Sequence, residues 1–241
     1  MKTLLNNLKK FLKKIIFNKS VALILIKPVL KLHSMCYYYA GRLGIILNNG
    51  LHPKHQILEY KEWFLKNIPE KGIILDIGCS TGELPKILSK KAKYIYGVEI
   101  DKKAISIANR ENKKNNITYI CSDAENYDYS KCLGIDCITL SNVLEHIENR
   151  NKFLKSLVNK TNWQENKKKM FLIRVPLLER EWIVIYKKQL NVEYRLDPTH
   201  YIEYTYEKLK NELEDANIII SDHSIRFGEL FVKAYVGDSI Q

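Results

Sequence analysis

The sequence predicts an α/β fold with a doubly wound, mostly parallel sheet of seven strands, the last strand antiparallel, preceded by a helical extension. From Lys71 onward, short runs rich in β-branched residues alternate with helical stretches. Such alternation is typical of a parallel sheet that helices cover on both faces. The chain then ends on two apolar runs with no helix between them, which predicts a closing β-hairpin.

The individual elements follow from the same alternation. The expected strands are the seven short apolar runs at residues 73–77, 94–100, 117–121, 136–140, 170–175, 218–224 and 230–236. The expected helices lie between them, at residues 83–91, 102–112, 149–161 and 205–216. Thr205 should cap the last of these helices, because a threonine hydroxyl can accept a hydrogen bond from a free backbone N–H of the first turn.

Positive charge is concentrated at the N-terminal end. The net charge is +12, yet residues 1–58 contain ten basic and no acidic residues, and the remainder carries 29 basic against 27 acidic residues. A nucleic-acid enzyme usually has its basic surface around the active site, because phosphate neutralisation supplies much of its affinity. We therefore expect no nucleic-acid partner.

The N-terminal extension has the pattern of a basic amphipathic helix. Apolar residues within 4–16 advance by three and four positions, with lysines on the opposite side. Such a helix suits an anionic membrane surface, which we expect residues 1–32 to contact; packing on the protein's own body or across a dimer is an equal alternative. The apolar run at 21–26 ends at Lys27-Pro28, far short of the roughly 20 residues that span a bilayer, so no transmembrane span is expected.

The composition changes near residues 58–70, which predicts an extension over 1–57 and a catalytic domain over 58–241. A single helix is expected at 55–67, burying Ile57, Leu58, Phe64 and Leu65. The five cysteines are odd in number and have no paired C-x-x-C spacing. We expect them to be reduced and mostly buried in a cytoplasmic protein, with association at the inner face of a membrane.

The first strand leads into a glycine turn and then directly into a helix. The turn contains Asp76, Gly78, Ser80 and Gly82. Glycines let the backbone approach a ligand closely, and a helix N-terminus presents free N–H groups. No Gly-Lys-Ser or Gly-Lys-Thr follows, and the spacing is not that of dinucleotide-binding proteins, in which Asp76 would also repel a pyrophosphate. A cofactor that carries an ammonium and a sulfonium group tolerates this carboxylate.

Two further acids follow later strands. Glu99 stands 21 residues after Gly78, near the separation at which an acid meets ribose hydroxyls. Asp101 is the competing residue, but it is better placed to cap the next helix. Asp123, followed by Ala124, offers an acceptor for an adenine amino group, although an aspartate in a loop is more often a turn residue.

Together these residues resemble the class I S-adenosylmethionine-dependent methyltransferases, which have a Rossmann-like fold, over about residues 58–240. The resemblance rests on four stretches in order, at residues 74–82, 97–101, 122–124 and 135–147. It implies S-adenosyl-L-methionine as the cofactor, bound by Asp76, Gly78, Ser80, Gly82, Glu99, Asp123, Ala124, Leu140 and Ser141. Ser80 replaces the family's middle glycine, and because serine is small we expect binding to survive.

Methyl transfer from a sulfonium is an in-line displacement, so positioning supplies much of the catalysis, and a hydroxyl acceptor also needs a general base. The candidates are Glu145, His146 and His200; the alternative for each is a structural role. Similar enzymes of ubiquinone synthesis have Glu-Val-x-Glu-His where this sequence begins with Asn142. Only two ligands for a hard ion remain, so we expect no required metal.

The expected function is methyl transfer to a small-molecule acceptor, on oxygen of a lipid-linked, quinone-like or saccharide compound near a membrane. One alternative is a nucleic-acid methyltransferase that uses residues 1–58 as a basic arm. The fourth strand lacks the Asn-Pro-Pro-Tyr-like turn that enzymes methylating base amino groups use. Another alternative is a protein that binds the cofactor without catalysing transfer.

Overall fold

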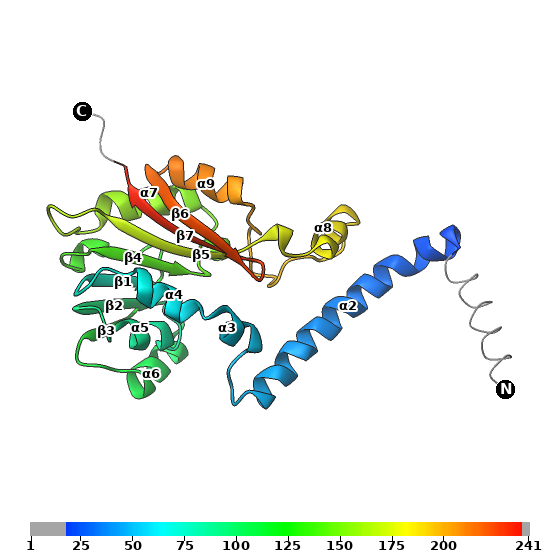
Figure 1. The fold of residues 1–241 in the computed structure, drawn as a ribbon, viewed down its shortest axis with the longest axis horizontal. Coiled ribbons are helices and arrows are strands. Elements are labelled where there is room, and N and C mark those ends of the chain that lie inside the picture. Colours follow the sequence, from blue (N-terminus) through cyan, green and yellow to red (C-terminus); the bar gives the residue numbers. More distant parts are fainter. Residues whose placement is uncertain (1–17, 238–241) are drawn as a thin grey trace. The chain divides into compact units, whose positions relative to one another are not determined.

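A computed structural model describes residues 18–237 (Figure 1), and the amphipathic pattern predicted for residues 4–16 lies outside this range. Contacts divide the chain into two compact units. The first comprises the chain up to Gln56 together with Trp182–Tyr194, and the second comprises Ile57–Glu181 and the chain from Arg195 onward. The domain boundary expected between residues 57 and 58 stays a prediction.

The second unit contains one seven-stranded sheet in the order β3-β2-β1-β4-β5-β7-β6. Its strands are β1 Ile73–Ile77, β2 Tyr94–Glu99, β3 Ile117–Cys121, β4 Cys137–Ser141, β5 Met170–Pro176, β6 Ile218–Arg226 and β7 Glu229–Val236. Strands β1 to β5 pair in parallel, whereas β7 runs antiparallel to both β5 and β6. The predicted mostly parallel sheet, with its last strand antiparallel in a closing hairpin, is confirmed.

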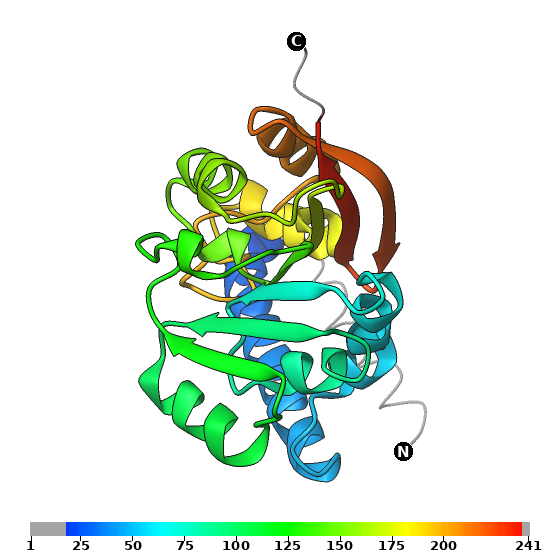
Figure 2. The same ribbon diagram turned by 90° about the vertical axis from the view of Figure 1, so that its left-hand side faces the viewer.

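Helices lie on both faces of this sheet (Figure 2). They are α4 Tyr60–Asn67, α5 Glu83–Leu88, α6 Lys102–Glu111, α7 Arg150–Lys160 and α9 Tyr206–Glu214, with short 3-10 turns η1 Tyr129–Lys131, η2 Leu144–His146 and η3 Leu178–Arg180. One apolar layer packs α7 and α9 on the sheet, and the other packs α4 and α5 on the opposite face. Because both faces are covered, β4 and β5 are buried over nearly their whole length.

Two predicted helix caps are present. The Asp101 side chain accepts a hydrogen bond of 2.8 Å from the backbone N–H of Lys103. The Thr205 hydroxyl accepts one of 3.2 Å from the N–H of Lys208. Both bonds satisfy donors that a helix leaves free in its first turn, so these boundaries are fixed by local side-chain chemistry.

The single helix expected at 55–67 is wrong. The chain forms two helices, α3 Pro53–Leu58 and α4, separated by Glu59 in a left-handed conformation with φ of 48°. Leu58 and Phe64 are buried as expected, but Ile57 is 60% exposed. The left-handed residue reorients the chain between the two helices, so one continuous helical face does not extend across it.

In the first unit, α2 Lys19–Leu47 is a helix of 29 residues that continues through Pro28. The apolar run does end at Lys27-Pro28, but the helix does not: Pro28 removes one backbone donor, and the remaining turns keep the helix intact. The short length of that run is therefore no argument against a membrane-crossing helix. By length and composition alone, α2 meets the requirements of a membrane-crossing helix. Helix α8 Trp182–Gln189 packs on it, and the Lys187 ammonium donates to the Ser34 hydroxyl at 2.9 Å.

All five cysteines are free, as expected for reduced thiols. Three are buried and two are exposed, namely Cys79, Cys132 and Cys137 in the interior, and Cys36 and Cys121 at the surface.

Candidate active site

The residues expected to bind the cofactor lie at the carboxyl ends of β1, β2 and β4, except Asp123 and Ala124, which follow β3. These three strands are parallel neighbours with β1 in the centre, and Ile77 pairs with Val98 on one side and Leu140 on the other. The chain crosses from one side of β1 to the other here, and ligands bind at such switch points in open α/β sheets. The topology therefore provides a switch point, the position at which such sheets have their ligand crevice, where the sequence predicts the cofactor.

The glycine turn after β1 needs its glycines. Gly78 has φ of 73°, and a Cβ on it would lie 2.5 Å from Cγ2 of Val143. Gly82 has φ of 80°, and its Cβ would lie 2.4 Å from the Tyr119 hydroxyl. Ser80 also adopts a left-handed conformation, with φ of 47°. Such a conformation costs a non-glycine residue about 1–2 kcal/mol, so the serine holds a backbone shape that glycine would adopt freely.

Glu99 ties this turn to the end of β2. One carboxylate oxygen accepts from the Ser80 backbone N–H at 3.0 Å, and the other accepts from the Asp101 N–H at 2.9 Å. An ionised carboxylate has about four lone-pair positions, so this one retains capacity for two hydroxyl donors. The bond between Glu99 and Ser80 is a contact that the sequence did not predict.

Asp76 lies beneath the turn and is only 2% exposed. One oxygen accepts from the Thr139 hydroxyl, and the other has no hydrogen-bond partner among residues 18–237. Burial raises the pKa of Asp76 to about 7, the Thr139 hydrogen bond lowers it, and the negative charge of Glu99 raises it further. A buried carboxylate oxygen without a partner is costly, and a cationic ligand group would relieve that cost.

The expected adenine and methionine contacts have different surroundings. Asp123 accepts from the Glu125 N–H at 2.9 Å and from the Asn126 amide at 2.6 Å, so its side chain closes a turn after β3. The Ala124 carbonyl accepts from the Tyr129 hydroxyl at 2.7 Å. Leu140 is fully buried in the core and Ser141 is half-buried. Contacts of all four residues with the cofactor stay predictions.

The three catalytic candidates lie together, although His200 is 54 residues after His146. Glu145 and His146 belong to η2, directly after β4, and His200 comes from the segment between α8 and α9. The imidazole rings pack edge to face with centroids 4.6 Å apart. The Tyr201 N–H donates to the Glu145 carbonyl at 2.8 Å, which anchors that segment at the end of β4.

Burial controls the protonation of two of these groups. Glu145 is 0% exposed, and burial raises its pKa to about 8. Neither of its carboxylate oxygens has a hydrogen-bond partner in the described part of the chain. Burial also lowers the pKa of His146, as does the neighbouring His200, against smaller opposing effects of Asp197 and Thr199. Near neutral pH this leaves a protonated carboxyl beside an uncharged imidazole.

Comparison with known proteins agrees with the fold and the motifs. Residues 75–161, which contain the glycine turn, Glu99 and η2, match the family model of a methyltransferase domain. A solved structure of an S-adenosylmethionine-dependent methyltransferase from Aquifex aeolicus superimposes with a TM-score of 0.58 at 19% identity, over 76% of this chain and 93% of that one. Residues 75–161 therefore match a methyltransferase domain, and the fold is that of the solved S-adenosylmethionine-dependent methyltransferase.

The relatives with names differ in what they methylate. A ribosomal protein L11 methyltransferase from Caldanaerobacter subterraneus is 31% identical over 169 residues, which are 62% of this chain and 54% of that protein. A ubiquinone biosynthesis O-methyltransferase from Coxiella burnetii is 31% identical over 85 residues, which are 34% of this chain and 36% of that protein. The chain thus spans about half or less of the length of these curated relatives.

The residues at these strand ends fit S-adenosyl-L-methionine, the cofactor for which the solved structure from Aquifex aeolicus is named. The buried oxygen of Asp76 without a partner suits a cationic group, and the carboxylate of Glu99 suits a pair of hydroxyls. The positive φ of Gly78 and Gly82 shapes the tight turn that carries the backbone from β1 to α5, next to these two carboxylates.

Glu203 is a residue of the candidate site that sequence reasoning missed. Its side chain is fully buried and binds the His200 Nδ1 at 2.9 Å, the Arg180 guanidinium at 2.6 Å and the Leu196 N–H at 2.7 Å. Burial raises the pKa of Glu203, but these hydrogen bonds and the charge of Arg180 outweigh it, so the net shift is downward. Glu203 is an ionised carboxylate that orients His200. The spacing of three residues between them was the available signal.

Arg174 holds the amide side chain of Asn142. Its guanidinium is buried, donates to the Asn142 side-chain oxygen at 3.1 Å and lies 4.1 Å from the centre of the Tyr60 ring. Asn142 adopts a left-handed φ of 56°, which asparagine tolerates better than most residues. The side chain that replaces a carboxylate in similar enzymes is therefore engaged with Arg174.

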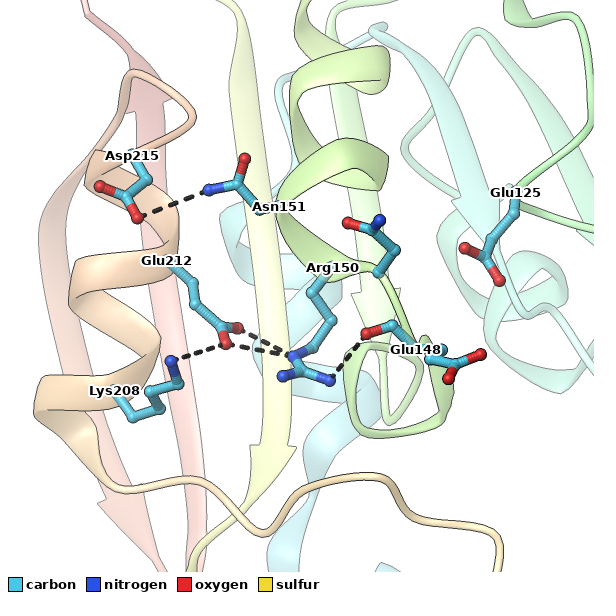
Figure 3. Close-up of a pocket in the computed structure, with 8 residues that line it drawn as sticks. Glu125, Glu148, Arg150, Asn151, Lys208, Glu212 and Asp215 are labelled. Carbon is cyan, nitrogen blue, oxygen red and sulfur yellow. Dashed lines mark hydrogen bonds and ion pairs between the residues drawn. The ribbon is translucent and has the colours of Figure 1, made fainter.

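A separate polar hollow of about 490 Å³ lies between α7 and α9 (Figure 3). Its charges largely pair with one another, since the Arg150 guanidinium donates to both oxygens of Glu212 at 3.1 and 3.2 Å and Lys208 lies 3.3 Å from the same carboxylate. None of the residues expected to bind the cofactor or to act in catalysis lines it. It is distinct from the crevice at the strand ends.

Proposed function

We propose that the protein transfers a methyl group from S-adenosylmethionine to an oxygen of a small-molecule acceptor, lipid-linked, quinone-like or a saccharide, at a membrane surface. The observation that carries this proposal is the position of Glu145, His146 and His200 at the carboxyl end of β4. Glu145 and His146 follow the strand that lies beside β1, whose end carries Asp76, and the His200 ring packs on that of His146. Groups suited to a cofactor and groups suited to an acceptor thus share one edge of the sheet.

Binding of the cofactor is the task of the first group of residues. Asp76 holds the cationic amino-acid part, Glu99 accepts from the ribose hydroxyls, and Asp123 and Ala124 border the adenine. The bound cofactor supplies a methyl group on a sulfonium, which is open to in-line attack. Glu99 also accepts from the Ser80 N–H, so one carboxylate contacts both the glycine turn and the ribose. This fixes the position of the cofactor relative to the turn, which supports catalysis by positioning.

Removal of the acceptor proton is the task of the second group. When no metal takes part, the acceptor oxygen forms a bond to the methyl carbon and the carbon–sulfur bond breaks. The hydroxyl proton passes to an imidazole. The lowered pKa of His146 keeps this imidazole uncharged and able to accept that proton. The ionised Glu203 lies 2.9 Å from Nδ1 of His200 and fixes the orientation of that ring beside His146.

The membrane part of the proposal rests on α2. Its solvent-facing side is apolar over most of the helix, with exposed Ile24, Leu25, Val29, Leu32, Met35, Leu43, Ile46 and Leu47. No acidic residue precedes Glu59, so anionic lipid headgroups complement this segment. Helix α8 places Lys187 against the middle of α2, which favours a helix that lies along the interface over one that crosses the bilayer.

A flotation experiment tests the membrane part. Full-length protein should float with anionic vesicles at low salt, and Leu32→Ser together with Ile46→Ser should reduce the bound fraction several-fold without changing affinity for S-adenosylhomocysteine. Ser221→Ala, an exposed change in β6, is the control. If the wild-type protein stays in the bottom fraction of the gradient at low salt, the membrane part of the proposal is wrong.

A second candidate acceptor is a protein, because one relative bears the name ribosomal protein L11 methyltransferase. Cofactor labelled in its methyl group would be incubated with the enzyme and with separate lipid, saccharide, ribosomal-protein and RNA fractions. We expect label in the lipid or saccharide fraction, dependent on Glu99. Label only in protein or RNA would replace the small-molecule acceptor, and absence of S-adenosylhomocysteine binding would overturn the proposed function as a whole.

A further inference from the structure

Three side chains at the acceptor end of the crevice have the composition of a metal site. We propose that Glu145, His146 and His200 bind one divalent transition-metal ion such as Zn²⁺. One ligand atom from each residue lies within 4.8 Å of those of the other two. Two imidazoles and one carboxylate are a common protein ligand set for zinc and for non-haem iron.

The carboxylate provides the second, independent observation. Glu145 is 0% exposed, yet neither of its oxygens has a hydrogen-bond partner in the part of the chain that the structure describes. Buried carboxylates in folded proteins are almost always hydrogen-bonded, paired or bound to a metal. Glu145 lies near two imidazoles, and an ion between the three groups would give one of its oxygens a partner.

The surroundings hold each imidazole by one nitrogen. Nδ1 of His200 binds Glu203, and Nδ1 of His146 lies 3.0 Å from the Thr199 hydroxyl, which in turn donates to Asp197 at 2.7 Å. The Nε2 atoms then remain as ligands. Metal-binding histidines typically have the other ring nitrogen fixed in this way, most often by a carboxylate, because it sets the tautomer and raises ligand basicity.

The geometry requires a small contraction. Zinc–ligand distances of roughly 2.0–2.1 Å place neighbouring tetrahedral ligand atoms about 3.3 Å apart. The ligand atoms therefore have to approach one another, a change that rotation of the exposed His146 side chain can supply.

The site suits a transition metal better than magnesium. Mg²⁺ favours oxygen ligands in a near-octahedral arrangement, and here two of the three ligands are imidazoles. Asn142, which stands where similar enzymes have a further carboxylate, is engaged with Arg174. The expectation that no metal is required counted only Glu145 and His146, and the fold adds His200 as a third ligand.

The catalytic role of the ion rests on the proposed function, but binding of the ion by these three residues does not. Three protein ligands leave a coordination position open, and an acceptor hydroxyl bound there would ionise more readily, releasing its proton to solvent. The substrate class would then be compounds whose hydroxyl can coordinate a metal. The ion would replace the imidazoles as the means of activating the acceptor.

Metal binding by the full-length protein tests the proposal. The protein is stripped with a chelator, its exposed thiols Cys36 and Cys121 are alkylated because thiolates also bind zinc, and Zn²⁺ or Co²⁺ is titrated in. We expect one ion per chain by metal analysis and the visible absorption of four-coordinate Co²⁺. Glu145→Gln and His200→Ala should each weaken binding at least tenfold, Glu203→Gln roughly 10–100-fold, and His223→Ala, an exposed histidine in β6, should leave it unchanged.

The outcomes separate this inference from the proposed function. Absence of stoichiometric metal, or metal that stays bound in both Glu145→Gln and His200→Ala, would overturn the metal site. S-adenosylhomocysteine titrated into the same samples reports cofactor binding. A variant that loses metal but still binds S-adenosylhomocysteine is folded, so its loss of metal supports the site.

Discussion

Replacement of Glu99 by alanine tests the cofactor crevice most directly. The Glu99 carboxylate accepts two backbone N–H bonds, from Ser80 and Asp101, and is expected to accept from the ribose hydroxyls as well. A hydrogen bond to a charged group contributes about 1.5–3 kcal/mol, and each 1.4 kcal/mol is about tenfold in affinity. Glu99→Ala should therefore weaken S-adenosylhomocysteine binding by roughly 10-fold to 150-fold.

Calorimetric titration of wild type and variant measures this loss, with NAD as the ligand control. Asp101→Ala is the matched control protein, because the Asp101 side chain caps α6 through Lys103 and makes no bond to the glycine turn. It should cost about 1 kcal/mol of stability and leave the affinity unchanged. Unchanged affinity in Glu99→Ala, or an equal loss in Asp101→Ala, would refute the assignment of the ribose acid.

Three further predictions concern pH, the turn and the acceptor side. Because burial raises the pKa of Asp76 to about 7, S-adenosylhomocysteine affinity should fall as pH decreases through 7, and calorimetry should find this dependence flattened in Asp76→Asn. Without ligand, the stability of the protein changes with pH in the opposite direction to the affinity. Folded Asp76 keeps a proton that the unfolded chain loses above about pH 4. The contribution of Asp76 to the free energy of unfolding therefore falls as pH rises from about 4 to 7. Gly82→Ala should lower the free energy of unfolding, measured in urea, by more than about 1–2 kcal/mol, because the clash with Tyr119 adds to the left-handed strain. Ser80→Gly should not destabilise the protein and should retain affinity for S-adenosylhomocysteine. Equal losses of stability in both variants would contradict this interpretation of the turn. Glu203→Ala should cost about 3–5 kcal/mol, measured by thermal and urea unfolding, because it leaves the charge of Arg180 buried without this carboxylate, and a loss below 1 kcal/mol would contradict the buried pair.

The order of the sheet elements could be predicted from local sequence. Alternating apolar runs mark all seven strands to within about two residues, because strand burial on both faces leaves a continuous apolar pattern. Asp101 and Thr205 mark helix starts, because a cap forms between neighbours in the chain. The glycine turn was also readable, since a positive φ at Gly78 and Gly82 restricts the residue type at those positions.

Local reading failed where a backbone choice depends on packing. Glu59 breaks a stretch whose apolar spacing favours one helix, and burial of Leu58 and Phe64 on separate helices stabilises that break. Pro28 usually ends a helix, yet α2 continues through it. Propensity differences of a few kcal/mol are outweighed in both places by the turns and contacts on either side.

The sequence by itself determined the fold class, the cofactor motifs and the identity of the candidate catalytic residues. Only the tertiary structure brought His200 beside Glu145 and His146, left the Glu145 carboxylate buried without a partner, and engaged Asn142 with Arg174. The physical reason is that a motif within one turn is set by neighbouring φ and ψ angles. The surroundings of a buried charge depend instead on segments that meet only after the sheet has formed.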